Sequence, residues 1–462
     1  MTDFASLLVA DRGQPARTIV RVVRAGFDQW LAAQPARHRA AAMAARFDGA
    51  PETLVILPGD GEDWSVAVGV DEADDPWALA AAAARLPEGH YRLDGAAPGQ
   101  GALGWLLAQH RFDRYRAAGD PPRPRVLLTP EPARIDEVVQ VAHATALVRD
   151  LVDTAANDLG PAELAAAAES VALAHGATFT VTQGDALAKG FPMVHAVGRA
   201  ASAARQPRMI ELAWGRAGDP RVAIVGKGVC FDSGGLDIKP SSGMLLMKKD
   251  MGGAAHALAL AGLVMQARLP IRLHLLIPAV ENAIAADAFR PGDVLASRTG
   301  LHVEIGNTDA EGRLILADAL AKACEEEPAL LIDFATLTGA ARVALGPDLP
   351  ALFASDDALA AELLAAGTSV ADPLWRLPLW TPYAEMLKSD VADINNAGSG
   401  GFAGSVTAAL FLQRFVQSGV DWAHLDTFAW RPAGRPGRPK GGDALGLRAA
   451  WEMLRRRFPP VA

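Results

Sequence analysis

The stretch LHVEIGNTDAEGRLILADALAKACEEE, residues 301–327, carries the pattern that decides the fold. Its first part, residues 301–307, alternates apolar and polar side chains, which is typical of a half-buried β-strand. From residue 314 onward, apolar side chains recur at helical spacing, which predicts a helix over 314–327. The stretch is therefore expected to fold as a strand that turns directly into a helix.

Strands and helices alternate in the same way from about residue 160 onward. Strands that alternate with helices of this length indicate βαβ units and a mainly parallel central sheet flanked by helices, which is an α/β fold. Ligands of such sheets bind beyond the carboxyl ends of the strands, so functional side chains are expected just after strands. The expected strands are 207–215, 220–226, 271–282 and 329–339, and a further helix is expected over 252–267.

The length of 462 residues exceeds that of one ordinary core and predicts two domains. Residues 1–136 mix short strands with alanine-rich helical stretches and show no cluster of acidic and basic side chains. A proline-rich segment at 117–136 cannot continue a helix and predicts a linker. We therefore expect a smaller N-terminal α/β domain over 1–136, with a structural or assembly role, and a larger domain over 137–462 that carries the functional residues.

Composition excludes several classes of protein. Half of the residues are hydrophobic and the formal net charge is −9, so the chain is globular and nucleic-acid binding is not favoured. The first residues include acids and no long apolar segment, and no apolar run reaches membrane-spanning length, so neither a signal peptide nor a membrane partner is predicted. The chain has 2 cysteines, too few for a disulfide framework, which favours a cytoplasmic location.

Two clusters of charged side chains follow predicted strands. The first is GKGVCFDSGGLDIKPSSGMLLMKKDMGGAAH, residues 226–256, whose glycine spacing fits neither a phosphate-binding loop nor a dinucleotide-binding turn. The second is the turn at 307–313, where an extended backbone would point alternate side chains the same way. The candidate site residues of the two clusters are Lys227, Asp232, Lys239, Asp250, Asp309, Glu311 and Arg313.

The acidic members of these clusters would repel one another if they met without compensation. Asp232, Asp250, Asp309 and Glu311 supply four negative charges, which two divalent cations would balance. The histidine-based zinc motif and the serine nucleophile elbow are both absent from the sequence, so carboxylates are expected to hold the ions. Surface ion pairs are the alternative for any one of these residues alone.

At this point the sequence resembles a known family. The octapeptide NTDAEGRL at 307–314 and the lysine–aspartate spacing of the first cluster are similar to the two signatures of the M17 leucyl aminopeptidases, also called cytosol aminopeptidases. Residues 147–165, 375–398 and 404–416 resemble other parts of the same catalytic domain, whereas residues 1–136 match only in size and position. The resemblance implies a metal-dependent aminopeptidase that acts on peptides as a homohexamer.

The resemblance also implies roles for individual residues. Asp232 and Glu311 would bridge two ions, manganese or zinc, and Asp309 would complete the coordination of one of them. Lys227, as a neutral amine, and Asp250 would complete the other. A further set would act on the substrate: Lys239 and Arg313 as the catalytic pair, with a bicarbonate held by the arginine, and Met247, Thr336 and Gly339 as the lining of the pocket for the first side chain.

Several alternatives stay open at this stage. A phosphoesterase would also use paired metals, and some relatives bind DNA, although the acidic balance argues against that role here. The pocket candidates carry no charge, so leucine or methionine is expected as the first residue ahead of aspartate or glutamate. Asp237 stands two residues before Lys239, where it could pair with a lysine or face away; if it reaches the pocket, lysine or arginine could rival leucine.

Overall fold

The structure is a computed structural model that describes residues 2–117 and 123–459. Residues 118–122 of the expected linker lie outside the described residues. Two compact units are present: Met1–Ala146 with Ala433–Lys440, and Leu147–Pro432 with Gly441–Ala462. The two-domain α/β architecture predicted from the sequence is confirmed.

The N-terminal unit is built on a six-stranded sheet with the order β1-β6-β5-β2-β4-β3. All neighbours in it are parallel except β3 and β4, which form an antiparallel hairpin. Its strands are β1 (Leu8–Ala10), β2 (Arg17–Val23), β3 (Leu54–Pro58), β4 (Trp64–Val70), β5 (Gly89–Leu93) and β6 (Arg125–Thr129). Its helices are α1 (Phe27–Ala32), α2 (Ala36–Ala44), α3 (Ala80–Arg85) and α4 (Gly101–Leu107).

Helix α5 (Ile135–Asp153) connects the two units in sequence. The division between the units falls at Ala146, inside this helix and later than the boundary expected at 136. The first half of α5 packs on the core of the N-terminal unit through Ala142 and Ala146, which explains why a proline-rich segment in the sequence does not coincide with the division. The segment Ala433–Lys440 also belongs to the N-terminal unit, and no local feature of the sequence predicted this assignment.

The larger unit contains a nine-stranded sheet with the order β16-β15-β18-β14-β9-β11-β8-β7, and β10 pairs with β11 beyond the end of β9. The four central strands β18, β14, β9 and β11 are parallel, whereas β15, β8 and β7 join antiparallel. The strands are β7 (Thr178–Gln183), β8 (Arg208–Trp214), β9 (Arg221–Gly226), β10 (Gly228–Asp232), β11 (Arg272–Asn282), β14 (Leu330–Ala335), β15 (Ala351–Ala354), β16 (Trp375–Arg376) and β18 (Trp422–Asp426).

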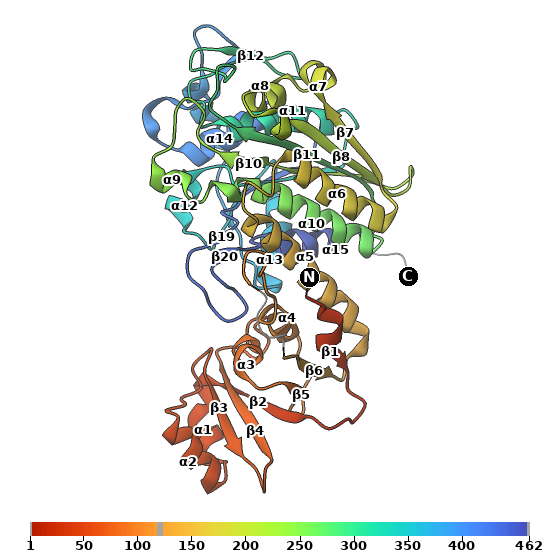
Figure 1. Cartoon of the computed structure of the whole chain (residues 1–462), viewed down its shortest axis with the longest axis vertical. Coiled ribbons are helices and arrows are strands. Elements are labelled where there is room, and N and C mark those ends of the chain that lie inside the picture. The colour runs from red at the N-terminus through yellow and green to blue at the C-terminus, as the bar shows by residue number, and fades with distance from the viewer. Residues whose placement is uncertain (1, 118–122, 460–462) are drawn as a thin grey trace. The chain divides into compact units, whose positions relative to one another are not determined.

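Helices cover both faces of this sheet, as Figure 1 shows. Helices α6, α10, α13 and α15 lie on one face, and α8, α11 and α14 lie on the other. Their bounds are α6 (Pro161–His175), α7 (Gly184–Gly190), α8 (Pro192–Gly198), α9 (Ser241–Met244), α10 (Gly252–Gln266), α11 (Glu311–Cys324), α12 (Gly339–Leu345), α13 (Asp357–Ser369), α14 (Gly404–Gln413) and α15 (Leu447–Arg457).

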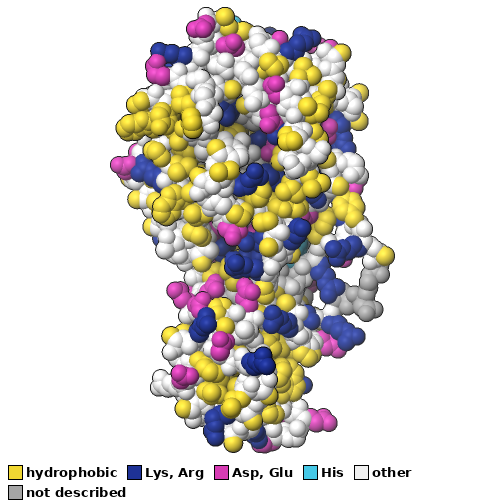
Figure 2. Space-filling view, turned by 90° about the vertical axis from the view of Figure 1, so that its left-hand side faces the viewer, with side chains coloured by type: hydrophobic (Ala, Val, Ile, Leu, Met, Phe, Trp, Pro, Cys, Tyr) yellow, Lys and Arg dark blue, Asp and Glu magenta, His cyan; other side chains and the backbone are white. Residues whose placement is uncertain are grey.

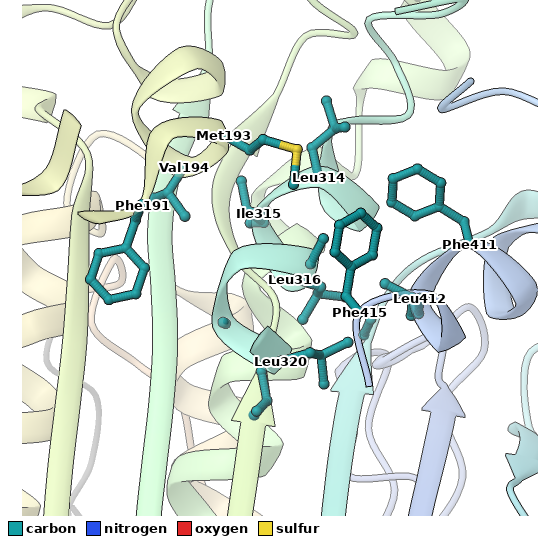
Figure 3. Close-up of a cluster of buried hydrophobic side chains, with 14 of the residues drawn as sticks. Phe191, Met193, Val194, Leu314, Ile315, Leu316, Leu320, Phe411, Leu412 and Phe415 are labelled. Carbon is teal, nitrogen blue, oxygen red and sulfur yellow. The ribbon is translucent and has the colours of Figure 1, made fainter. Parts of the chain in front are cut away.

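The core between the sheet and α11 fixes that helix in place. Leu314, Ile315 and Leu320 of α11 are fully buried against side chains of α8 and α14 (Figure 3). Asp318 on the same helix accepts hydrogen bonds from the Met193 and Val194 amides at the start of α8, with N···O distances of 2.8 and 3.3 Å. Because α11 is held on several sides, the residues at its first turn are rigidly positioned.

The strand expected over 301–307 is only partly formed. Residues His302–Glu304 form β13, which pairs with β12 (Val294–Ala296) and β17 (Ile394–Asn395) in a small separate sheet. The last two strands, β19 (Trp430–Arg431) and β20 (Gly441–Gly442), form a short antiparallel pair. The turn at 307–310 therefore follows a strand of the small sheet and not one of the central sheet.

Candidate active site

The candidate residues lie where the sheet geometry predicts functional side chains. Lys227 follows β9 directly, and Asp232 is the last residue of β10. Asp250 belongs to a short 3-10 helix, Met247–Met251, that leads into α10, and Thr336 follows β14. These strands are parallel, so their carboxyl ends bring the side chains to one edge of the sheet.

Lys227 is the centre of the first group of contacts. Its Nζ atom lies 2.7 Å from Asp250 Oδ2 and 2.9 Å from Glu311 Oε1, and it donates to the Thr336 carbonyl at 3.2 Å. A Cβ atom at Gly312 would lie 2.6 Å from Lys227 Nζ, so a side chain there would displace the lysine. The glycine between the acid and the base of the octapeptide is thus required by this close approach.

Lys239 is the centre of the second group. Its Nζ atom lies 2.8 Å from Asp232 Oδ2 and 2.5 Å from Asp309 Oδ1. The other oxygen of Asp232 accepts hydrogen bonds from the Asn282 side chain and the Gly234 amide, both at 2.9 Å. Asp232 is therefore held in one orientation with a single oxygen facing Lys239.

The two groups form one cluster of carboxylates. Oxygen atoms of Asp232, Asp309 and Glu311 lie within 4.8 Å of one another. Glu311 is 1% exposed, and its Oε2 atom makes neither a hydrogen bond nor an ion pair with any residue that the structure describes. A buried oxygen without a partner is costly, and a bound cation would satisfy it. The cluster therefore fits divalent cations with oxygen ligands.

The pKa values of the acids show the same deficit of positive charge. Burial, together with the charge of Asp232, raises the pKa of Glu311 to about 8 and that of Asp309 to about 6. Burial lowers the pKa of Lys227, but the carboxylates of Asp250 and Glu311 outweigh it, so the pKa lies above its ordinary value. Bound cations would reverse both effects, because they stabilise carboxylates and penalise an ammonium group.

The turn at 309–313 differs from the sequence prediction. The backbone does not stay extended, because helix α11 begins at Glu311. An acidic side chain in the first turn is favourable near the positive end of the helix dipole, and this favours an earlier start than residue 314. Asp309 and Glu311 still converge, but they do so through a tight turn followed by the first turn of α11. The predicted explanation, an extended backbone that points alternate side chains the same way, was wrong.

Arg313 lies two residues into the same helix. Its Nη1 atom donates to the Asn396 carbonyl at 2.7 Å, whereas its Nε atom is buried and makes no hydrogen bond with the described residues. Burial lowers the pKa of Arg313 to about 10, so the guanidinium stays charged at neutral pH. Asn396 also accepts from the Gly306 and Asn307 amides at 2.8 and 3.2 Å, and thereby positions the turn.

Asp237 does not contact Lys239. Its Oδ2 atom accepts from the Thr308 amide at 2.7 Å, and its own amide donates to Thr308 Oγ1 at 2.8 Å. Thr308 is fully buried and its hydroxyl donates to the Gly234 carbonyl at 2.6 Å. Asp237 therefore ties the glycine-rich loop to the segment that carries Asp309, a function that the sequence pattern left undecided.

A cleft of about 480 Å³ opens over the cluster. Its lining includes every predicted site residue except Glu311, which lies behind Lys227. The predicted residues that line the cleft are Lys227, Asp232, Lys239, Met247, Asp250, Asp309, Arg313, Thr336 and Gly339. The structure thus brings together residues from two distant stretches of sequence in one concave site.

Sequence analysis missed several cleft residues, three of which lie together. Lys249, Arg342 and Phe428 line the cleft beside the pocket candidates. Burial lowers the pKa of Lys249 to about 8, against the opposing effect of the Asp250 carboxylate. The adjacent lysines 248 and 249 were the only local signal, and the sequence does not tell which of them faces the cleft.

Comparisons with known proteins identify the family of the chain. The family model described as "Cytosol aminopeptidase family, catalytic domain" matches residues 146–450, and "M17 aminopeptidase, N-terminal domain" matches 18–128. A probable cytosol aminopeptidase of Syntrophotalea carbinolica is 42% identical over 368 residues, which are 76% of this chain and 73% of that protein. One from Roseiflexus castenholzii is 42% identical over 76% of this chain and 75% of its own length.

Solved structures are similar over nearly the whole chain. The cytosol aminopeptidase of Coxiella burnetii is 45% identical, with a TM-score of 0.92 over 98% of this chain and 99% of that one. The bottromycin maturation enzyme BotP, solved in complex with Mn, is 34% identical, with a TM-score of 0.86 over 98% and 100%. A mutant of tomato leucine aminopeptidase is 29% identical, with a TM-score of 0.84 over 97% and 96%.

Fold and site together define an α/β protein with a candidate metal centre beside the carboxyl ends of the parallel central strands. The chain belongs to the cytosol aminopeptidase family M17, and it is accordingly a metal-dependent aminopeptidase. Among the described residues, no helix combines the length and the apolar character that a membrane span requires.

Proposed function

We propose that this enzyme removes the first residue from peptides by a two-metal mechanism and accepts leucine or another apolar residue at that position. The observation that carries the proposal is the convergence of four carboxylates on two lysines at the floor of one cleft, with Glu311 Oε2 left without a partner. Surface ion pairs would not place an unpaired carboxylate oxygen in a fully buried position.

Two divalent ions, manganese or zinc, would be held by the clustered carboxylates. From the family resemblance, Asp232 and Glu311 would be shared by both ions, Asp309 would serve one of them, and Asp250 with Lys227 would serve the other. Divalent ions in such a site polarise a carbonyl group and lower the pKa of water. Manganese is supported by its presence in the complex of BotP.

Lys239 and Arg313 are the cationic side chains proposed to act on the substrate. Lys239 is partly exposed to the cleft, with 14% of its side chain accessible, and would stabilise negative charge on the substrate carbonyl oxygen. Arg313 keeps its Nε donor unused, which suits it to hold an anion such as bicarbonate. Arg313 would hold and orient this anion, which would supply a general base beside the metals.

The pocket for the first side chain would be lined by Met247, Thr336 and Gly339. The Thr336 hydroxyl donates to Asp250 Oδ1 at 2.7 Å, so it is occupied within the protein and not offered to substrate. With its hydroxyl used, Thr336 adds to a neutral wall beside Met247, which favours an aliphatic first residue. One methylene in such a pocket changes selectivity by about 1–3 kcal/mol, so the preference should be graded.

A homohexamer in the cytoplasm is the proposed working form. Large apolar side chains are exposed on the larger unit, including Trp375 at 58%, Val391 at 70% and Phe402 at 81%. Exposed apolar side chains of this size favour burial in an assembly. Light scattering at low micromolar concentration tests the hexamer directly, and a monomeric mass with full activity would contradict it.

An aminoacyl-anilide panel tests the proposed function. The enzyme, dialysed against a chelator and reloaded with Mn, Zn, Co or Mg in turn, is assayed with leucine anilide, N-acetyl-leucine anilide and a phosphate monoester. We expect cleavage of leucine anilide alone, because a free α-amine is needed as a ligand to the metals. Cleavage of the acetylated substrate would refute the aminopeptidase mechanism, and cleavage of the phosphate ester would instead support a phosphoesterase.

A further inference from the structure

Lys249 is a buried lysine without a counter-ion. It is 5% exposed and lines the cleft next to Met247 and Thr336. Within the part of the chain that the structure describes, its Nζ atom makes no hydrogen bond or ion pair, and its one side-chain contact of a polar kind is the Phe428 ring, 4.9 Å from Nζ to the centroid. The Nζ atom is not enclosed by the protein but meets the space of the cleft, where a bound ligand would supply an acceptor.

Arg342 contacts the same aromatic ring from another helix. It lies on α12 and is exposed, and its Cζ atom lies 5.1 Å from the centroid of the same Phe428 ring. It also lines the cleft, and among the described residues it has no ion pair. On the face that carries α9 and α12, basic side chains lie among hydrophobic ones, as Figure 2 shows. One aromatic ring thus supports two cations in the same cleft.

The nearby acids make no ion pair with these two cations among the described residues. Asp426 accepts from the Leu337 amide at 2.9 Å and from the Thr338 amide and hydroxyl at 3.2 and 2.6 Å. Asp250 pairs with Lys227 and accepts from Thr336. Neutral donors leave the charge of Asp426 in place, so the end of the cleft at Phe428 carries two cations against this one carboxylate.

We propose that Lys249 and Arg342 bind the side-chain carboxylate of an acidic first residue, so that the enzyme cleaves peptides beginning with glutamate or aspartate as well as leucine. The inference rests on the proposed function, because it assigns a second substrate class to the same pocket. The methylene groups of glutamate would lie along Met247 and Phe428, and the carboxylate would meet the two cations. Lysine and arginine side chains would be repelled.

The test compares glutamate and glutamine, which have the same shape and differ in charge. Anilide substrates have no carboxyl terminus, so any effect of a carboxylate must come from the first side chain. For the wild-type enzyme loaded with Mn, kcat/KM for glutamate anilide is expected to exceed that for glutamine anilide by about tenfold or more, as for a charge-assisted hydrogen bond. Lysine anilide is expected to be the poorest substrate.

Two variants then test whether Lys249 and Arg342 cause the preference for glutamate over glutamine. Lys249→Met should reduce the glutamate/glutamine ratio by about tenfold or more, and exposed Arg342→Glu should reduce it by about threefold or more and raise cleavage of lysine anilide. The matched control is Lys248→Met, since Lys248 donates to the Asp153 carbonyl and does not line the cleft. Its glutamate/glutamine ratio should equal that of the wild type.

The outcomes separate the two proposals. Cleavage of leucine but not glutamate by the wild type, or an unchanged ratio in both Lys249→Met and Arg342→Glu, refutes the acidic pocket and leaves the aminopeptidase intact. Failure to cleave any of the free-amine anilides with metals bound refutes the proposed function itself. If Lys249→Met does not fold, the surface variant Arg342→Glu decides alone.

Discussion

Replacement of Asp237 by alanine tests how the metal-binding segment is held. The change removes the acceptor of the Thr308 amide, whose distance to Asp237 Oδ2 is 2.7 Å. Asp309 is the next residue and a proposed metal ligand, so loss of this tie should loosen one ligand. Asp237 itself is exposed and contributes no atom to the cleft lining that the structure describes.

The size of the effect follows from the kind of bond that is lost. A hydrogen bond to a charged group contributes about 1.5–3 kcal/mol when shielded. Because Asp237 is exposed, water can replace part of the interaction, and about 1–2 kcal/mol is the expected loss. If the loss falls on the metal-bound state, the Mn concentration for half-maximal activity rises about five- to thirtyfold.

The assay is Mn titration of the chelator-treated enzyme with leucine anilide, together with thermal unfolding of the metal-free protein. Asp237→Asn keeps an acceptor oxygen and should lie between wild type and Asp237→Ala. Asp356→Ala is the matched control, because Asp356 also accepts backbone amides, those of Ala358 and Leu359, but at the start of α13. Wild-type Mn dependence in Asp237→Ala would refute the reasoning.

Further expected results concern the site and its charges. Dialysis against a chelator should abolish activity and Mn should restore it; full activity in enzyme shown metal-free by elemental analysis would contradict the metal assignment. Lys227→Ala should lose one metal, whereas Lys239→Ala should keep both and lose kcat, and equal metal loss in the two variants would show that the roles are wrong. Glu311→Gln should lower metal affinity and turnover while circular dichroism stays native, since the change removes charge and keeps shape. Burial raises the pKa of Asp318 from 3.8 to about 6. Its folded-state pKa lies above the unfolded value, so its contribution to stability is full well below pH 3.8 and is lost as pH rises through 6. In Asp318→Asn the fall in stability from pH 4 to 7 should be smaller by about 2 kcal/mol, measured by denaturant unfolding.

The sheet could be predicted because its signal is local. The strands expected at 207–215, 220–226 and 271–282 match β8, β9 and β11 within one residue at either end, since continuous apolar runs bounded by turn residues are typical of buried strands. The start of α11 could not be placed by the same reasoning. Residues 309–313 are polar and small, so periodicity says nothing there, and the cap and dipole preferences that decide the start are weak signals.

The convergence of the charged clusters was predicted, but the reason holds for only one of them. The first cluster follows strands of the central sheet, whose carboxyl ends lie at one edge. The turn at 307–310 follows β13 of the small sheet, and the position of α11 against the central sheet brings its residues to the same place. The partners that orient them were less accessible. Asn282 binds Asp232, Asn396 binds Arg313, and Asp237 binds the Thr308 amide next to Asp309. Each of these partners comes from another segment, and a lone polar residue in a sequence gives no sign of its contact.

Selectivity is the property least accessible from the motifs. The residues proposed for chemistry lie within two short segments, so chains that share these segments are expected to share the reaction. The pocket end is proposed to include Lys249, which directly precedes Asp250 in the first of these segments, but Arg342 and Phe428 come from two other segments and meet Lys249 only in the folded protein. A change at any one of them would alter the charge seen by the first side chain without touching the carboxylates beneath. Family membership therefore supports the hydrolysis of a first residue, and the identity of that residue must be decided from the pocket of each chain.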